Sequence, residues 1–221
     1  METRLFTRQE TDFVIRQLPN PPYRTILDIC CGQGRHANIL ADTGYDVVGV
    51  DADSEALAVA QSSSVAPVNY VCNDIRRLRE IDGIFDAAML LWQSFGYFDQ
   101  ATNEDILIMA SEKLRPKGRF ILDIYNRNYW EQNQGDSQFE RKGTRIHTTS
   151  AMRGNRLSCH LRYDGGESET FDWQLYSLDE IVDLAEQCRL SCLLSCTESD
   201  EGKPVSDVNS QMQIVFEKQT Y

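Results

Sequence analysis

The stretch Ile26–Asp51, I-L-D-I-C-C-G-Q-G-R-H-A-N-I-L-A-D-T-G-Y-D-V-V-G-V-D, decides the fold. It opens with an apolar run of the length of a buried strand, and Gly32 and Gly34 follow where that strand must turn sharply. An amphipathic helical stretch comes next, and Gly44 is well placed to end it. A second short apolar run then leads to Asp51. This order of strand, glycine turn, helix, strand and acid predicts a βαβ nucleotide-binding unit.

The glycine turn and Asp51 together indicate an adenosine-bearing ligand. Glycines let the backbone approach a ligand closely, and the start of the following helix presents free N–H groups. A carboxylate at the end of the next strand can accept two hydrogen bonds from a ribose diol. The spacing Gly32-x-Gly34-x-x-Ala37 also matches the dinucleotide fingerprint, so an NAD-dependent oxidoreductase stays open as an alternative.

Two further acids favour a different cofactor. Asp28 places a negative charge next to the position of a pyrophosphate, where like charges would repel. That carboxylate suits a cofactor with a sulfonium and an amino group. Asp74 follows a third predicted strand, residues 68–72, where it can accept from an adenine amino group while Ile75 packs on the ring. Cys30-Cys31 stands immediately before the first glycine.

Three segments, L-D-I-C-C-G-Q-G-R-H, G-V-D and N-D-I, resemble the class I S-adenosylmethionine-dependent methyltransferases. The resemblance is good from about residue 5 to 130 and looser beyond. The family's first motif reads acid-x-Gly-x-Gly-x-Gly, and Cys30 occupies the first glycine position here. The resemblance implies that S-adenosyl-L-methionine is the cofactor. It implies that the cofactor-binding residues are Asp28, Cys30, Gly32, Asp51, Ala52, Asp74, Ile75 and Leu91.

The segment before the first strand is the part that often folds over the bound cofactor in this family. Phe6 and Tyr23 are the candidates for such a lid. A helix packed on the edge of the sheet is an equally good interpretation of the same residues.

An aromatic loop, residues 92–98, follows the fourth predicted strand. Exposed aromatic side chains mark binding surfaces, and the carboxyl ends of parallel strands line the ligand crevice. We therefore expect Trp92, Ser94 and Tyr97 to lie at the substrate or the cofactor. Packing alone is the alternative interpretation.

The exit of the fifth predicted strand reads D-x-x-N-R-N-Y over residues 123–129. Together with Gln93-Ser94-Phe95 it is similar to glycine N-methyltransferase-like small-molecule enzymes, in which an Arg after strand five holds the substrate carboxylate. The resemblance implies this role for Arg127 if a two-residue offset is allowed, and Tyr125 takes the position otherwise. A surface ion pair between Arg127 and Glu131 is the competing interpretation.

These elements predict an α/β fold: a Rossmann-like, seven-stranded, mostly parallel sheet flanked by helices. We expect residues 1–221 to form a single class I methyltransferase domain. Between about residues 136 and 176, β-prone alternation and two glycine turns predict a three-stranded antiparallel insertion after strand five. Capping boxes are predicted at Thr7–Glu10 and at Ser177–Glu180.

Composition narrows the partners. The formal net charge is −12, from 34 acids and 22 bases, and such a surface repels phosphate backbones, which disfavours an RNA methyltransferase. No apolar run is long enough to span a bilayer. The seven cysteines show no disulfide or zinc spacing, so a reducing cytoplasm and no metal are expected. In small-molecule methyltransferases such insertions often wall off the substrate pocket or pair with another subunit, so the resemblance implies either role for this one, the second giving a homodimer.

The resulting hypothesis is methyl transfer to a small-molecule acceptor, an amine or a carboxylate or hydroxyl, by in-line displacement. Positioning and exclusion of water suffice for this reaction. Tyr97, Tyr125 and Arg127 would orient the acceptor, and a tyrosine hydroxyl could remove a proton. A binding protein for the same cofactor without turnover stays open as a further alternative.

Overall fold

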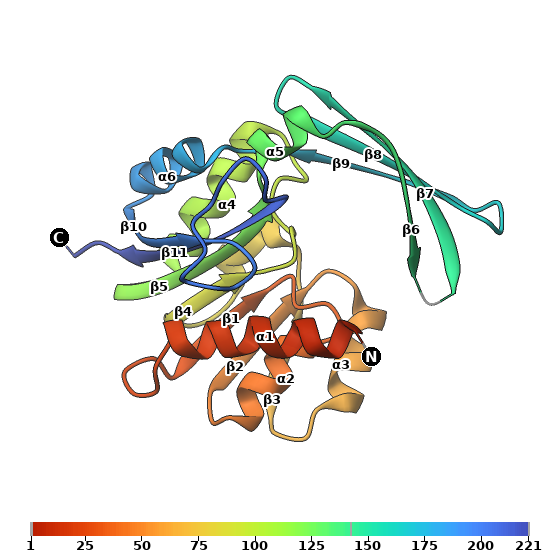
Figure 1. Ribbon diagram of the computed structural model, residues 1–221. Coiled ribbons are helices and arrows are strands. Elements are labelled where there is room, and N and C mark those ends of the chain that lie inside the picture. The colour runs from red at the N-terminus through yellow and green to blue at the C-terminus, as the bar shows by residue number, and fades with distance from the viewer. Residues whose placement is uncertain (1, 142, 221) are drawn as a thin grey trace.

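The computed structural model describes residues 2–141 and 143–220, with side chains from residue 7 to 140 and from 143 to 220 (Figure 1). Its centre is a seven-stranded sheet with the strand order β10-β11-β5-β4-β1-β2-β3. Strands β1 to β5 run parallel, and β11 is antiparallel to both of its neighbours. The sheet strands are β1 (Thr25–Ile29), β2 (Asp46–Asp51), β3 (Val68–Cys72), β4 (Phe85–Leu90), β5 (Leu114–Tyr125), β10 (Leu190–Cys196) and β11 (Gln211–Lys218). The predicted seven-stranded, mostly parallel sheet is confirmed.

Helices cover both faces of this sheet (Figure 1). Alternate residues of each central strand face opposite layers. Leu27 of β1 packs in the cluster that contains Ile106 of α4, whereas Ile26 packs in the cluster that contains Phe13 of α1. The helices are α1 (Glu2–Gln17), α2 (Arg35–Asp42), α3 (Ser54–Ser63), the 3₁₀ helix η1 (Ile75–Glu80), α4 (Gln100–Glu112), α5 (Arg127–Gln132) and α6 (Leu178–Gln187).

The insertion differs from its prediction in strand number. It is a four-stranded antiparallel sheet, β6 (Gly135–Arg141), β7 (Thr144–Arg153), β8 (Arg156–Tyr163) and β9 (Ser168–Gln174), and it projects from the body as a curved arm (Figure 1). The missed strand is β6. Among its residues Phe139 is the one large apolar side chain, so no apolar alternation marks it. It forms because β7 offers a pairing edge from Thr144 to Ser150.

The two predicted capping boxes have different outcomes. At the start of α6, the Ser177 hydroxyl and the Glu180 carboxylate bond each other's backbone N–H, as predicted. The predicted box at Thr7 is wrong, because α1 already begins at Glu2 and Thr7 lies inside it. The helix ends before Pro19, whose ring disfavours a helical residue in front of it.

The two lid candidates of the sequence are Phe6 and Tyr23. Phe6 lies outside the described side chains. Tyr23 is buried, and the guanidinium groups of Arg115 and Arg119 lie over its ring. This contact fixes Tyr23 at the end of the sheet opposite the glycine turn. None of the helices within residues 2–220 that the structure describes is long and apolar enough to cross a membrane.

Candidate functional site

A cavity of about 220 Å³ lies where β1, β2 and β3 end. Parallel strands bring their carboxyl ends to one edge of the sheet, so acids far apart in sequence meet there. Of the predicted site residues, the cavity is lined by Cys30, Asp51, Ala52, Asp74, Ile75 and Tyr97, together with Ser94, Phe98 and Asn73. A second cavity of about 320 Å³ lies between α4, α6 and β9, and the glycine turn contributes none of its lining.

Asp51 is held in place by the glycine turn. Its Oδ2 accepts a hydrogen bond from the backbone N–H of Gly32 at 2.7 Å, and its Oδ1 accepts from that of Asp53 at 2.9 Å. An ionised carboxylate has about four lone-pair directions. Asp51 therefore keeps capacity for two further donors, such as the hydroxyls of a ribose.

Asp74 caps the start of η1 and is ion-paired. Its carboxylate accepts from Nε of Arg76 at 2.9 Å and from Nη2 at 2.5 Å. This hydrogen bonding lowers the pKa of Asp74 to about 2. The Arg76 guanidinium lies 4.9 Å from the centre of the Phe98 ring, which lines the cavity. Asp74 is thus a permanent acceptor at the far end of the cavity from β1.

Asp28 is the most unusual carboxylate of the site. Its side chain is 2% exposed, and burial raises its pKa to about 8, against the opposing field of Arg35. Its Oδ2 has no hydrogen-bond partner among the described residues, and neither has Nη2 of Arg35. A buried polar atom without a partner is costly. One oxygen of Asp28 and one guanidinium nitrogen of Arg35 thus keep unused hydrogen-bonding capacity among the described residues.

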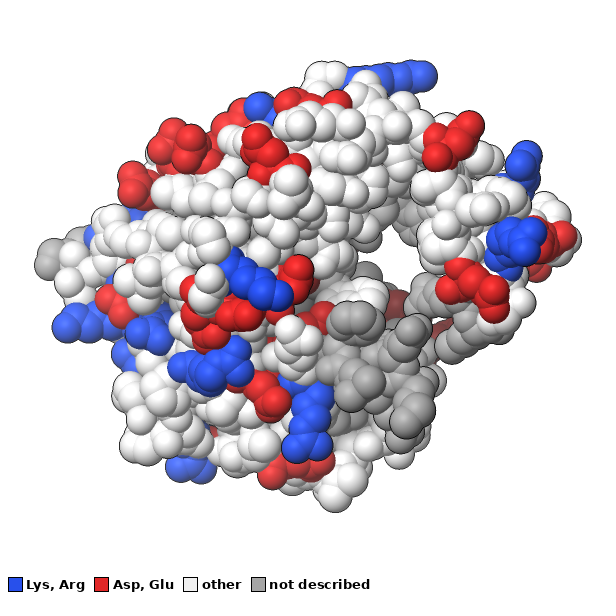
Figure 2. Space-filling model, in the orientation of Figure 1, with Lys and Arg blue, Asp and Glu red and all other residues white. Residues whose placement is uncertain are grey.

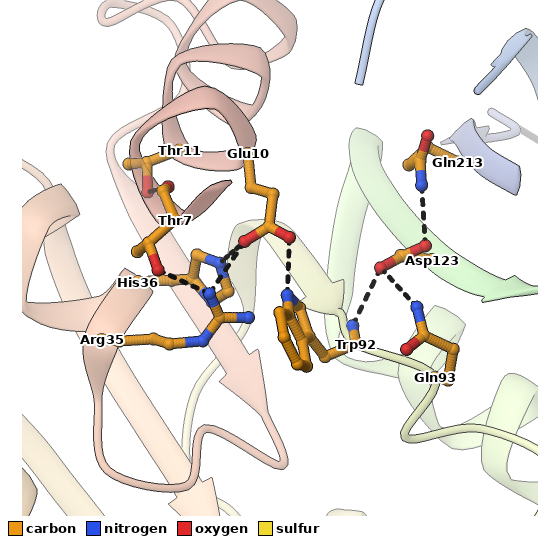
Figure 3. A network of polar contacts seen from close by, with 9 residues as sticks. All are labelled: Thr7, Glu10, Thr11, Arg35, His36, Trp92, Gln93, Asp123 and Gln213. Carbon is orange, nitrogen blue, oxygen red and sulfur yellow. Dashed lines mark hydrogen bonds and ion pairs between the residues drawn. The ribbon is translucent and has the colours of Figure 1, made fainter. Parts of the chain in front are cut away.

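Arg35 is held by α1 and by the aromatic loop. Its Nη1 donates to Thr7 Oγ1 at 2.7 Å and to Glu10 Oε2 at 2.9 Å (Figure 3). Its guanidinium lies 4.1 Å from the centre of the Trp92 ring. His36 Nε2 also contacts Glu10 Oε2, at 2.9 Å. Helix α1 thus orients the residue that directly follows the glycine turn.

Within the glycine turn, Gly34 is the position that most clearly requires a residue without a side chain. Gly34 has φ +70°, and a Cβ there would lie 2.1 Å from the Tyr70 hydroxyl oxygen. Gly32 has φ +53°, but a Cβ there would meet open space. Cys30, the residue in the first glycine position of the motif, also has a positive φ of 59°. A left-handed conformation is strained for any residue with a Cβ.

The two predicted tyrosines lie at the root of the insertion. Tyr97 is 44% exposed and lines the cavity, with its ring 5.6 Å from that of Trp173. Tyr125 packs edge-on against Trp173 and Trp130, at 5.3 and 5.5 Å. Burial raises the pKa of Tyr125 to about 12 and also raises that of Tyr97. Both hydroxyls are therefore neutral near pH 7, so neither is a strong base as it stands.

Arg127 is not among the residues that line the cavity. Its Nη1 donates to Glu180 at 2.6 Å, and its Nε lies 3.1 Å from Glu131. These contacts include the ion pair with Glu131 that the competing interpretation of the sequence predicted. Leu91 is buried beneath the aromatic loop and, like Gly32 and Asp28, is not among the cavity-lining residues.

Sequence reasoning missed three residues at this site: Glu10, Arg35 and Asp123. Arg35 carried a readable signal, because a cation placed directly after a glycine turn faces the same ligand as the turn. Glu10 and Asp123 carried none, since their partners lie 25 and 30 residues away or further. Among the residues described, no group of three or more His, Cys, Asp or Glu side chains could hold a metal ion.

Comparison with known proteins agrees with this geometry. Residues 26–118 match the model of a family described as a methyltransferase domain. A putative methyltransferase of Bacillus subtilis, YqeM, is 33% identical over 110 residues, which are 48% of this chain and 44% of that protein. A glycine/sarcosine N-methyltransferase of Halorhodospira halochloris is 35% identical over 127 residues, 55% of this chain and 47% of that protein. The chain thus spans about half the length of the curated relatives it matches.

Among solved structures, an S-adenosylmethionine-dependent methyltransferase from Clostridium acetobutylicum superposes with a TM-score of 0.85. The match covers 96% of this chain and 92% of that one. Because the sequence identity is 19%, the match shows a shared fold. Residues 26–118 are thus similar to a methyltransferase domain, and the chain shares its fold with a solved S-adenosylmethionine-dependent methyltransferase.

Proposed function

We propose that this chain transfers a methyl group from S-adenosyl-L-methionine to a small-molecule acceptor. The observation that carries the proposal is Oδ2 of buried Asp28, which has no partner among the described residues and directly precedes Ile29, a residue that lines the same cavity as Asp51 and Asp74. The donor is cationic at its amino group and its sulfur. A pyrophosphate-bearing dinucleotide would bring negative charge to Asp28, which favours the methyl donor over a nicotinamide cofactor.

Each end of the donor has a matching group. Asp28 would hold its amino group and Arg35 its carboxylate, through the Nη2 that has no partner among the described residues. Asp51 would accept from the ribose hydroxyls. Asp74 would accept from the adenine amino group, with Ile75 packed on the ring. Cys30, Ala52, Gly32 and Leu91 would shape the walls around these contacts.

The chemistry asked of the chain is modest. Bound S-adenosyl-L-methionine supplies an activated methyl group, whose bond to sulfur breaks as the acceptor's lone pair forms the new bond to carbon. The residues of the chain bind, orient and exclude water, which can supply most of the rate enhancement for two well-placed reactants. Tyr97 lines the cavity and would contact the acceptor; with a raised pKa it would donate a hydrogen bond more readily than it would accept a proton.

The acceptor class is a finer proposal. We propose a small amine, in line with the glycine/sarcosine N-methyltransferase named among the relatives. Carboxylate and hydroxyl acceptors are the alternatives. Arg127 and Tyr125 stay predictions as acceptor-orienting residues. The ion pairs of Arg127 with Glu131 and Glu180 do not favour a role for its guanidinium in holding a carboxylate.

Calorimetric titration with S-adenosylmethionine and, separately, with NAD tests the cofactor. Binding of the first and not the second is expected, and the reverse would refute the proposal. Transfer of labelled methyl to a panel of glycine, sarcosine, amino sugars and small phenols then tests turnover. Donor binding without any labelled product across that panel would favour a binding protein without catalysis.

We also propose that residues 1–221 act as one domain in the cytoplasm and that the insertion sheet pairs with a second copy. Strand β6 lies at the edge of that sheet, and Phe139 is 47% exposed on it. An exposed edge strand is a ready template for pairing. Light scattering of the wild type and of Phe139→Lys tests this. A dimer that the substitution converts to monomer is expected, whereas a monomeric wild type would refute it.

A further inference from the structure

Asp123 is a buried carboxylate that the proposed donor contacts do not use. It lies on β5 at 5% exposure, opposite Gln213 of β11 in the strand register. Its Oδ1 accepts from Gln213 Nε2 at 2.8 Å. Its Oδ2 accepts from the backbone N–H of Trp92 at 3.0 Å and from Gln93 Nε2 at 3.1 Å (Figure 3). A buried carboxylate is retained only at a cost, so this arrangement needs a physical reason.

The backbone that Asp123 holds is strained. Trp92 and Gln93 have φ values of 57° and 55°, two consecutive residues with side chains in the left-handed region. The backbone N–H of Gln93 donates to the carbonyl oxygen of Asp123 at 3.1 Å. Asp123 thus accepts one hydrogen bond from Trp92 and two from Gln93. Strain of this kind persists where the surroundings fix it, and it concentrates at functional sites.

The strained turn connects the two halves of the site. On one side, the Trp92 ring lies against the Arg35 guanidinium, and its Nε1 donates to Glu10 Oε1 at 2.6 Å. On the other side, Ser94 and Tyr97 line the cavity. A turn that relaxed toward right-handed backbone would rotate Trp92 away from Arg35 and shift the cavity wall at the same time.

We propose that Asp123 is a positioning residue, which locks the left-handed Trp92–Gln93 turn and through it sets Arg35 on the donor side and Tyr97 on the acceptor side. Its effect on ligand binding rests on the proposed function. The lock itself is a property of the unliganded chain. The two claims can therefore fail separately.

The hydrogen-bond polarity explains why an acid is needed. Gln213 Oε1 already accepts from the backbone N–H of Ser199 at 3.0 Å, so the amide of Gln213 is oriented with its nitrogen toward Asp123. All three groups facing the carboxylate are donors. An asparagine at this position would place its own NH₂ against at least one of them.

The test is Asp123→Asn, measured for donor binding and for the environment of Trp92. We expect the dissociation constant of S-adenosylmethionine to rise at least tenfold. We also expect the indole N–H resonance of Trp92, identified by its loss in Trp92→Phe, to shift, while that of Trp130 keeps its position. A merely structural role would lower the melting temperature without moving the resonance of a folded chain.

Two further variants keep the result decisive. Ile106→Val, in the core of α4 at 1% exposure, is the stability control and should change neither the Trp92 resonance nor the affinity. Gln93→Asn tests the lock if Asp123→Asn does not fold: asparagine tolerates the left-handed backbone but is too short to reach Asp123. It should move the Trp92 resonance in the same direction.

Three outcomes are informative. An unchanged resonance in folded Asp123→Asn would overturn the proposal. A shifted resonance with unchanged donor affinity would overturn the role of Asp123 at the site. A wild type that does not bind S-adenosylmethionine would refute the proposed function, while a shifted resonance would still support the lock.

Discussion

Replacement of Asp28 by Asn probes the donor site at the group on which it depends most. Asp28 is buried, and its pKa is raised to about 8. At pH 7 about nine tenths of the unliganded molecules therefore carry a protonated carboxyl group. A donor ammonium placed at the unpartnered Oδ2 favours the ionised form. Binding of S-adenosylmethionine should thus release close to one proton at pH 7.

The affinity follows from the same linkage. Between pH 6 and pH 7 the ammonium of the donor stays protonated while ionisation of Asp28 becomes easier, so the association constant should rise about tenfold. Asparagine cannot ionise. Removal of one partner of a buried charged pair costs about 2–5 kcal/mol, which corresponds to a roughly 30-fold or greater loss of affinity.

Whereas the donor affinity should rise with pH, the contribution of Asp28 to the free energy of unfolding of the unliganded chain should fall. The pKa of Asp28 lies above its ordinary value of 3.8, so its contribution to stability is present below about pH 4 and is lost as the pH rises through about 8. The loss amounts to at most roughly 6 kcal/mol. Because asparagine resembles the protonated acid, Asp28→Asn should exceed the wild type in the free energy of unfolding by about 2 kcal/mol at pH 5 and by roughly 5 kcal/mol or more at pH 8.5.

Two measurements test these predictions for Asp28. Calorimetry in two buffers of different ionisation enthalpy counts the released protons, and urea unfolding at pH 5 and pH 8.5 gives the free energies. Equal donor affinity of Asp28→Asn and the wild type, or equal proton release from both, would refute the reasoning.

Three further predictions concern the glycine turn, Cys30 and Arg127. Gly34→Ala should lower the free energy of unfolding by about 3 kcal/mol, because a strained φ is combined with a Cβ 2.1 Å from the Tyr70 hydroxyl oxygen. Gly32→Ala, with open space at the Cβ, should cost only about 1 kcal/mol; equal losses in urea unfolding would contradict the geometry. Cys30→Gly should raise the free energy of unfolding by up to about 1 kcal/mol, since its φ of 59° suits glycine, and a lower value would show that the thiol packing outweighs the strain. Arg127→Ala should leave the affinity for S-adenosylmethionine within about twofold, because its guanidinium pairs with carboxylates that do not line the cavity; a larger loss in calorimetry would place it at the donor.

The sequence alone determined the central sheet and the acids at its edge. Strand β3 occupies residues 68–72 and β2 ends at Asp51, as the apolar runs predicted. These signals are local: a buried parallel strand is mostly apolar, and a tight turn often contains glycine. Once the strands are known to be parallel, Asp51 and Asp74 must meet at one edge.

Other features came from long-range pairing. Strand β6 has no apolar alternation and exists because β7 presents an edge. Arg127 was predicted at the acceptor, yet its guanidinium finds Glu180, which is 53 residues away. Charged side chains are long and flexible, so their partners are chosen by the packing of whole elements and not by neighbouring residues.

The tertiary structure also decided what the site lacks and what holds it. One oxygen of Asp28 and one nitrogen of Arg35 have no partner within the described part of the chain, and this depends on every residue packed around them. The left-handed turn at Trp92 depends on a carboxylate 31 residues later. Local sequence fixes which groups reach the edge of a sheet. Only the folded chain fixes which of their hydrogen bonds remain open, because burial removes water as the alternative partner.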